Sequence, residues 1–350
     1  MSQTSPVAPP ATHTTTRSEP SEFIVLPDLL GDCHYRLRVN PHYDMVSRAS
    51  EQWLFDEGRL VEPEITKFVG LRAGYLTAAC YPDADPFHLQ VCSDFMNWSW
   101  KMDDWLDEFD VDSVLGMREC CISAFRDPIN FHTNRTAGKM CKSFFSRFRE
   151  TGGPGCTERL IHTTDLYFIA AAKEVDHPAK GHIHDLESYI TFRRDTSGCK
   201  CCFALIEYAA QIDLPDEVVS HPVMMATEGA ANDHVSWVND ICSYNVEQSR
   251  NVSHNLIALL MRERGLDLQD AVDYSGQMCK SAMQRFEDNR AILPSWGEEV
   301  DRQVAIYVQG LQDWIIANYH WSFESTRYFG KDGEAVKRDR IIKLLPKRPL

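Results

Sequence analysis

The feature that most constrains the fold of this chain is a helical spacing of apolar residues that continues almost without a break from residue 42. Apolar residues recur at three- and four-residue intervals, and glycine or proline clusters separate one segment from the next. No series of alternating strands and no internal repeat interrupts the pattern. The sequence therefore predicts one all-α domain, with helices near residues 42–57, 62–79, 86–108, 111–126, 156–175, 184–195, 199–212, 216–247, 252–263, 267–290 and 297–322.

The two ends of the chain differ in composition from this helical part. Residues 1–22 are rich in Pro, Ser and Thr and contain no apolar stretch, which predicts a disordered tail. Residues 23–330 form the expected domain, which is large for one unit but possible for an all-α protein of this length. Residues 331–350 are basic in an otherwise acidic chain. They are either a solvated tail or a segment that folds over an anionic site.

Charge and cysteine usage exclude several classes of function. The formal net charge of -15 argues against a nucleic-acid or anionic-membrane partner, because both attract Lys and Arg. We find no apolar run long enough to span a bilayer and no signal peptide, so we expect a cytoplasmic protein. The 12 cysteines should then be mostly reduced thiols, and they lack the paired CxxC spacing of a zinc site.

An acidic cluster, DDWLDE, ends the aromatic-rich helix predicted over 86–108. Asp103 and Asp107 lie one turn apart on the same helical face, where like charges repel. A hard cation such as Mg²⁺ prefers carboxylate oxygens and would offset that repulsion. The alternative is a solvated acidic face, which is the commoner role of such a cluster taken alone.

A second polar group lies on the helix predicted over 216–247. Asn239, Ser243 and Glu247 stand at i, i+4 and i+8 and form one stripe two turns long. An amide oxygen, a hydroxyl and a carboxylate are three hard ligands that can converge on one Mg²⁺. An exposed polar stripe is the alternative. The surrounding helix is largely apolar, however, which favours a stripe that faces a cavity.

The two motifs together, in this order, resemble the metal-binding motifs of class I terpene cyclases. Two further matches are the stretch ITFRRDTSG, which is similar to the family's diphosphate-sensing arginine before a helix break, and the pair Arg327-Tyr328. Arg250, three residues after Glu247, matches a basic residue that often follows the second motif. The resemblance extends from about residue 23 to residue 330 and is strongest to fungal sesquiterpene cyclases. It departs at Lys101 and at the doublet Cys201-Cys202, where related sequences tend to have proline.

The resemblance implies an all-α helical bundle around a central cavity, with three Mg²⁺ ions and an isoprenoid diphosphate as substrate. It assigns two ions to Asp103 and Asp107, and the third to the stripe of Asn239, Ser243 and Glu247. The residues expected to donate hydrogen bonds to the diphosphate are Arg194, Arg250, Arg327 and Tyr328. Arg193 is the alternative sensor; we favour Arg194 because it lies four residues before Gly198. The break at Gly198 is also expected to aim a backbone carbonyl at the developing cation.

Aromatic residues near the motifs are the candidates for the cavity wall. A carbocation needs a dry cavity and π faces, because water would quench it. The residues expected to contact the substrate are Trp100, Phe203, Trp314 and Trp321, with Trp98 as a further candidate. Plain core packing is the alternative for each of them.

The resemblance implies a magnesium-dependent sesquiterpene synthase that cyclises farnesyl diphosphate, with geranyl diphosphate as the second choice of substrate, acting as a monomer or homodimer. A prenyl diphosphate synthase, which elongates chains, is the nearest enzymatic alternative. It would need a second aspartate-rich motif where this chain has NDICSYNVE. A non-enzymatic helical scaffold is the alternative from another class, but it would have no use for two metal motifs and an Arg-Tyr pair.

Overall fold

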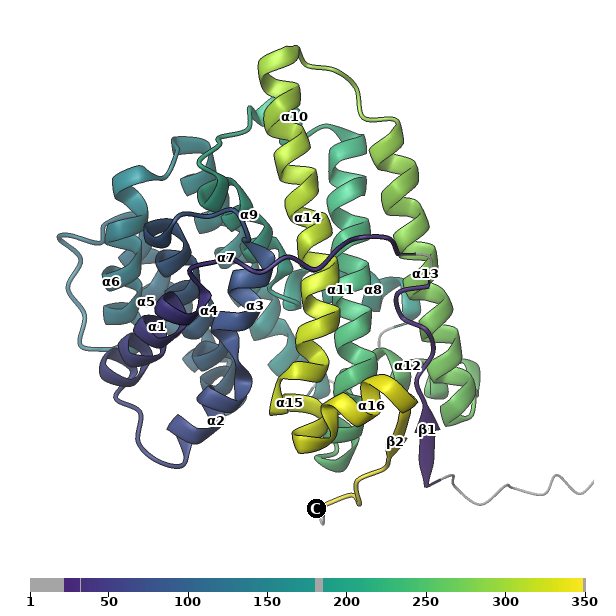
Figure 1. The fold of residues 1–350 in the computed structure, drawn as a ribbon. Helices are drawn as coiled ribbons and strands as arrows, with labels where there is room; N and C mark the ends of the chain where they lie inside the picture. Colours follow the sequence, from purple (N-terminus) through teal and green to yellow (C-terminus); the bar gives the residue numbers. More distant parts are fainter. Residues whose placement is uncertain (1–21, 32, 180–184, 349–350) are drawn as a thin grey trace, which may run out of the picture.

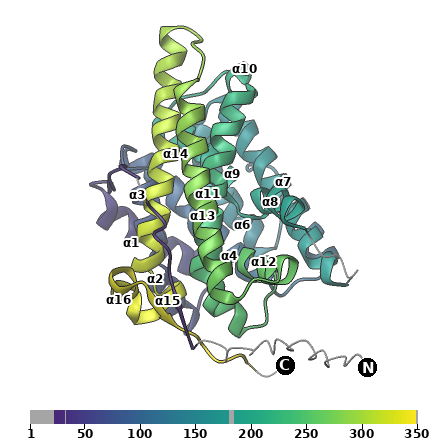
Figure 2. The same ribbon diagram turned by 90° about the vertical axis from the view of Figure 1, so that its right-hand side faces the viewer.

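The structure, a computed structural model, describes residues 22–31, 33–179 and 185–348. The chain folds into a helical bundle, which confirms the predicted all-α class (Figures 1 and 2). Its longer helices are α1 (Tyr43–Gly58), α4 (Pro86–Leu106), α5 (Val111–Arg126), α6 (Thr136–Thr151), α7 (Pro154–Ala179), α8 (Leu186–Thr196), α9 (Cys199–Ala210), α11 (Pro222–Ser249), α13 (Leu268–Ala291) and α14 (Glu298–Glu324). The shorter ones are α2 (Glu64–Leu71), α3 (Ala73–Cys80), α10 (Asp216–Val219), α12 (Leu256–Arg264), α15 (Thr326–Phe329) and α16 (Gly333–Asp339).

The helices surround an interior that is reached by both predicted metal motifs. Helices α11, α13 and α14 run side by side in one half of the molecule, and α1, α4, α5 and α6 make up much of the other half (Figure 1). Helices α7, α8 and α9 complete the ring between them. Because α4 and α11 belong to opposite halves, the motif at the end of α4 faces the stripe on α11 across the bundle.

Local sequence signals set the boundaries of the helices that carry the site. Helix α4 begins where the Asp85 side chain accepts hydrogen bonds from the backbone N–H groups of Phe87 and His88, with Pro86 in the first turn. Asp185 caps α8 in the same way. Gly198 has φ +72°, a left-handed conformation that favours glycine, and it separates α8 from α9. The helix break predicted at Gly198 is therefore present.

Helix α6 is an element that the sequence analysis missed. It lies between residues 126 and 156, where no helix is predicted, and its buried face consists of Ala137, Met140, Cys141, Phe144, Phe145 and Phe148. These residues recur at three- and four-residue spacing, so the signal for a helix is present in the sequence. Their aromatic side chains stack into the core, with the Phe145 and Phe148 ring centroids 5.0 Å apart.

The segment after residue 330, expected as a basic tail, contains α16 and a short strand β2 (Ile341–Lys343), which follow the 3-10 turn Gly330–Asp332. β2 pairs antiparallel with β1 (Phe23–Val25), so that Ile24 lies opposite Ile342 and both are buried. Side chains near the end of α11 hold the residues beyond β2: Asn245 accepts from the N–H of Leu345, and Gln248 donates to its carbonyl. The segment thus packs against the domain.

Two further expectations concern parts of the chain outside the bundle's core. The predicted N-terminal tail, residues 1–22, lies outside the described residues except for residue 22. Within the described ranges, no helix combines the length and the apolar character that crossing a bilayer requires.

Two of the predicted helices, over residues 62–79 and 216–247, are each divided into two helices in the structure. The first is divided at Arg72, which has φ +54°.

Candidate active site

Two adjoining cavities lie inside the bundle. The inner one, which we call the chamber, has a volume of about 170 Å³ and is walled mainly by apolar and aromatic residues. The outer one, which we call the mouth, has a volume of about 460 Å³ and contains most of the carboxylates and arginines of both motifs. The two cavities share a boundary of residues that line both: Trp100, Asp103, Arg193, Thr196, Asn239 and Arg327.

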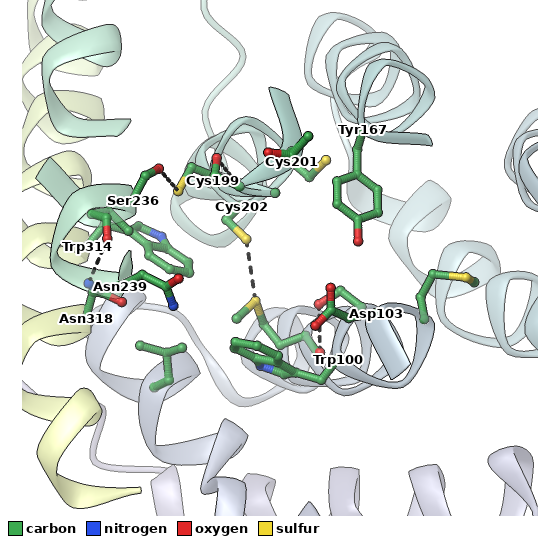
Figure 3. A pocket seen from close by; sticks show the side chains of 18 of the residues that line it. Trp100, Asp103, Tyr167, Cys199, Cys201, Cys202, Ser236, Asn239, Trp314 and Asn318 are labelled. Carbon is green, nitrogen blue, oxygen red and sulfur yellow. Dashed lines mark hydrogen bonds between the residues drawn. The ribbon is translucent and has the colours of Figure 1, made fainter. Parts of the chain in front are cut away.

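All four tryptophans that were candidates for the wall line the chamber. Figure 3 shows two of them, Trp100 and Trp314. Trp100 stacks on Trp321 with ring centroids 5.3 Å apart, and the Trp321 indole donates a 2.7 Å hydrogen bond to the carbonyl of Leu71. Trp314 reaches the chamber from α14 and Trp98 from α4. The aromatic rings thus come from two helices, α4 and α14, whose Trp100 and Trp321 rings lie side by side.

Phe203 does not belong to this wall, and its assignment is corrected. Its side chain has no exposed surface and lies edge-on behind Trp314, with ring centroids 6.0 Å apart. It is absent from the residues that line the chamber. The helical spacing of α9 turns Phe203 toward α14, while its neighbours on the preceding turn face the cavity. Phe203 is a core residue that supports Trp314.

The cysteines of α9 are chamber residues, and the sequence analysis named only two of them, Cys201 and Cys202, as a departure from the family pattern. Cys199, Cys201 and Cys202 line the chamber, and the Cys202 sulfur lies 3.7 Å from that of Met96 (Figure 3). Burial raises the pKa of the Cys202 thiol well above its usual value and that of Cys201 to about 11. These thiols are therefore neutral and polarisable at physiological pH, which suits an apolar wall.

The carboxylates of the first motif gather at the mouth. Asp103, Asp104 and Asp107 all line it, and α4 ends at Leu106, so Asp107 occupies the C-terminal cap. Lys67 forms a 2.5 Å ion pair with Asp104. The pKa of Asp107 is raised to about 6 by burial and by the negative charges of Asp103 and Asp104, with nearby arginines acting in the opposite direction. The like-charge repulsion expected from the spacing is present.

The three residues of the second motif also line the mouth, on α11. Asn239 accepts a 2.9 Å hydrogen bond from the Arg193 guanidinium and donates a 2.5 Å one to the Tyr328 hydroxyl. The Glu247 carboxylate accepts a 2.9 Å hydrogen bond from the side-chain amide of Asn255. Burial raises the pKa of Glu247, and the charge of Asp240 adds to this effect. The stripe faces a cavity, as predicted, rather than bulk solvent.

The choice between the two neighbouring arginines is corrected by the structure. Arg194 points away from both cavities and forms a two-pronged ion pair with Asp233, with N···O distances of 2.7 Å. Arg193 instead lines both the chamber and the mouth and contacts Asn239 and Asp240. Consecutive helical residues point about 100° apart, so only one of the pair can face the site. The spacing between these arginines and Gly198 does not determine which of the two faces the site.

The remaining cations that the sequence analysis selected reach the mouth. The guanidinium carbon of Arg327 lies 4.6 Å from the centroid of the Trp100 ring. The Nη2 atom of Arg327 lies 3.4 Å from a carboxylate oxygen of Asp103. Tyr328 is buried and bonded to Asn239, and Arg250 lines the mouth beyond the end of α11. The predicted Arg-Tyr pair and both metal motifs thus meet in one place.

Glu174 is a mouth residue that the sequence analysis did not select. It lies on α7, and one carboxylate oxygen is 3.9 Å from the imidazole of His254. The pKa of Glu174 is raised to about 7, mainly by burial and also by the charges of Asp103, Asp107 and Glu247, with Arg193 acting in the opposite direction. No local motif surrounds Glu174 in the sequence, so only the packing of α7 against α8 brings it to the site.

Comparison with known proteins decides the family. The family model described as "Terpene synthase family 2, C-terminal metal binding" matches residues 94–285, more than half of the chain. The chain belongs to terpene synthase family 2. The matched region contains both metal motifs and the helix break, while Arg327 and Tyr328 lie beyond its end.

Relatives in fungi match nearly the whole chain. Sesquiterpene synthase Agr1 of Cyclocybe aegerita is 44% identical over 340 residues, which cover 96% of this chain and 98% of the relative. The alpha-muurolene synthase of Coprinopsis cinerea is 42% identical over 97% of this chain and 82% of its own. The Delta(6)-protoilludene synthase of Armillaria gallica is 33% identical over 93% and 95%. The resemblance to fungal sesquiterpene synthases is confirmed.

Solved structures confirm the fold of this family member. The crystal structure of an α-eudesmol synthase superposes with a TM-score of 0.75 at 22% identity, covering 83% of this chain and 97% of the other. The germacradien-4-ol synthase of Streptomyces citricolor gives 0.72 at 21% identity over 83% and 97%. At such low identity the likeness concerns the fold alone.

The donor set of the mouth fits a hard divalent cation. Among the described residues, no group of three or more His, Cys, Asp or Glu side chains is arranged to hold a metal ion alone. The first motif offers carboxylate oxygens, and the second offers one carboxylate together with an amide oxygen and a hydroxyl. Mg²⁺ characteristically binds to one or two carboxylates and completes its shell with water and phosphate oxygens. The residues present therefore fit magnesium.

Proposed function

We propose that this terpene synthase family member is a sesquiterpene synthase, a carbon–oxygen lyase that ionises farnesyl diphosphate with Mg²⁺, cyclises the cation and releases diphosphate. The observation that carries the proposal is the contact between an oxygen-lined, charged mouth and an aromatic chamber across one boundary of shared residues. The names of the fungal relatives, which are sesquiterpene synthases, support a substrate with fifteen carbons.

The mouth is suited to binding a diphosphate and making it a leaving group. Asp103 and Asp107 on α4 would hold magnesium on one side, and Asn239, Ser243 and Glu247 on α11 would hold it on the other. Bound magnesium supplies the positive charge that stabilises a departing diphosphate. The side chains that would donate to the diphosphate oxygens and orient them are Arg193, Arg250, Arg327 and Tyr328. Here Arg193 takes the role that the sequence analysis gave to Arg194.

The chamber is suited to the steps after ionisation. Trp100, Trp314 and Trp321 present aromatic rings to the chamber, and Trp314 and Trp321 are buried. Attraction of a cation to such rings is worth about 2 kcal/mol or more when both are desolvated. The neutral thiols of α9 complete the wall without introducing a charged nucleophile. The chamber thus favours folding and ring closure of the isoprenoid carbocation over its capture by water.

Two alternatives make different demands on the same site. A chain-elongating synthase needs a second aspartate-rich cluster opposite Asp103, but this position is occupied by the stripe of Asn239, Ser243 and Glu247. A scaffold has no need of carboxylates whose pKa is raised in a shared cavity, as Asp107 and Glu174 are. Both features favour the lyase.

Release of inorganic diphosphate from farnesyl diphosphate by the purified protein tests the proposal. We expect release with Mg²⁺ and no second substrate, and none in excess chelator. A requirement for isopentenyl diphosphate would instead establish the elongating alternative. Absence of release under every one of these conditions would contradict both enzymatic assignments.

A further inference from the structure

Asn255 lies in the short connection between α11 and α12, behind the second metal motif. It is fully buried, with no exposed surface, and it immediately precedes the first residue of α12. It does not line the mouth. We propose that Asn255 is a positioning residue that holds the Glu247 carboxylate in place for the metal, an inference that rests on the proposed function.

The side-chain amide of Asn255 donates toward α11. It lies 2.7 Å from the backbone carbonyl of Asp240 and 2.9 Å from the Glu247 carboxylate, so both of its hydrogens have an acceptor. The Ser243 hydroxyl is 3.5 Å from the same nitrogen. One buried amide thus reaches two of the three residues of the stripe, Ser243 and Glu247, together with the backbone carbonyl of Asp240, three residues before Ser243.

The other end of the Asn255 side chain fixes its orientation. Its carbonyl oxygen accepts a 2.8 Å hydrogen bond from the backbone N–H of Ile257 and so caps α12. A flipped amide would place this oxygen against the Glu247 carboxylate and the Asp240 carbonyl, leaving the Ile257 N–H unpaired. Only one orientation satisfies all three groups, and it presents hydrogen-bond donors to the metal motif.

Holding Glu247 in this way has a direct consequence for ion binding. A donor at 2.9 Å stabilises the charged carboxylate and restricts its rotation. Groups that orient a metal ligand typically contribute about 10- to 100-fold to metal affinity or activity.

Two substitutions separate this role from the helix cap. Asn255→Ser retains an oxygen at the capping position but removes the amide donor, whereas Asn255→Ala removes both. Asn40→Ser is the matched control: Asn40 is also buried, its oxygen accepts from the N–H of His42 two residues on, and its amide donates to the carbonyls of Tyr81 and Ala84. Asn40 lines neither cavity.

The experiment titrates Mg²⁺ at fixed inorganic pyrophosphate and follows the melting temperature, which rises as the ligands bind the folded state. We expect both Asn255 variants to need about 10- to 100-fold more Mg²⁺ for half of the wild-type shift. Without ligands, Asn255→Ala should melt lower than Asn255→Ser because it alone loses the cap. Asn40→Ser should lower the ligand-free melting temperature yet keep the wild-type Mg²⁺ requirement.

A purely structural role for Asn255 gives a different pattern. The capping oxygen of Asn255→Ser would then restore the wild-type Mg²⁺ requirement, and that result would overturn the proposal. A wild-type protein that shows no shift with Mg²⁺ and pyrophosphate together would instead contradict the proposed function, so the two failures are distinguishable.

Discussion

The mouth and the chamber adjoin each other but are built on opposite physical principles. In the mouth, several of the expected ligands are already bound to another side chain: Asp103 to Arg327, Asp104 to Lys67, Asn239 to Arg193 and Glu247 to Asn255. In the chamber, neutral rings and thiols pack against one another. The mouth is held together by ion pairs and hydrogen bonds between polar side chains, whereas the chamber is held together by packing of neutral side chains.

This difference has a thermodynamic side. Carboxylates crowded in the mouth have raised pKa values, so their charges lower the stability of the ligand-free protein. The buried tryptophans of the chamber contribute to stability by burying apolar area. Substitutions in the mouth should therefore lower the rate of the reaction and can raise the stability of the ligand-free protein. Substitutions in the chamber should change the products and lower the stability.

The largest effect should follow removal of the second metal motif. Changing Asn239, Ser243 and Glu247 together to alanine keeps good helix formers in α11 but removes three oxygen ligands. Loss of a metal that provides several kcal/mol of transition-state stabilisation corresponds to about a thousandfold or more in turnover. Diphosphate release measures the loss, and circular dichroism checks that the helices remain. Wild-type turnover in the triple variant would remove the mouth from the reaction.

The next effect distinguishes the two neighbouring arginines. Arg193→Lys keeps a positive charge in the mouth but loses the planar fork, so turnover should fall about 100-fold. Arg194→Lys is its matched control, because Arg194 pairs with Asp233 outside both cavities, and turnover should change by less than about threefold. Steady-state kinetics measure both. The reverse order would restore Arg194 as the sensor.

Substitutions in the wall should change the product more than the rate. Trp100→Phe, Trp314→Leu and Trp321→Leu should preserve ionisation but shift products toward linear or prematurely quenched alcohols, because a cation loses a π face. Phe203→Leu is the control from behind the wall; it should cost about 1 kcal/mol of stability and leave the products unchanged. Product profiles and melting curves are compared for each. A variant with an unchanged profile and a large loss of stability assigns its tryptophan to the core.

The smallest effect concerns the charge of Asp107. Its pKa is raised to about 6 from 3.8, so the folded protein binds this proton more tightly than the unfolded chain does. The resulting loss of stability develops as the pH rises from about 4 to about 6 and is constant above. Asp107→Asn should therefore raise the ligand-free melting temperature by about 1–2 °C at neutral pH, and by less at pH 4.5. An equal gain at both values would show that the carboxylate is not perturbed in this way.

Local pattern predicted most of the fold and much of the site. Helical spacing located the helices that carry Asp103 and Asn239, and side chains one turn apart reliably share a face. Which of two consecutive residues faces a cavity depends on how the helix is rotated against its neighbours, and so Arg194 was chosen over Arg193. The same limit applies to Phe203. Glu174 and Asn255 have no local motif, and only the packing of α7 and α12 against the other helices brings them to the site.

The central claim is that the mouth ionises the substrate and that the chamber then folds the cation. The most direct test incubates the purified protein with farnesyl diphosphate and Mg²⁺, and measures released diphosphate and, by gas chromatography with mass spectrometry, the products of the same sample. We predict cyclic fifteen-carbon products in step with diphosphate, and neither in excess chelator. Diphosphate accompanied only by linear farnesyl alcohols would contradict the role of the chamber, and cyclic products formed without Mg²⁺ would contradict that of the mouth.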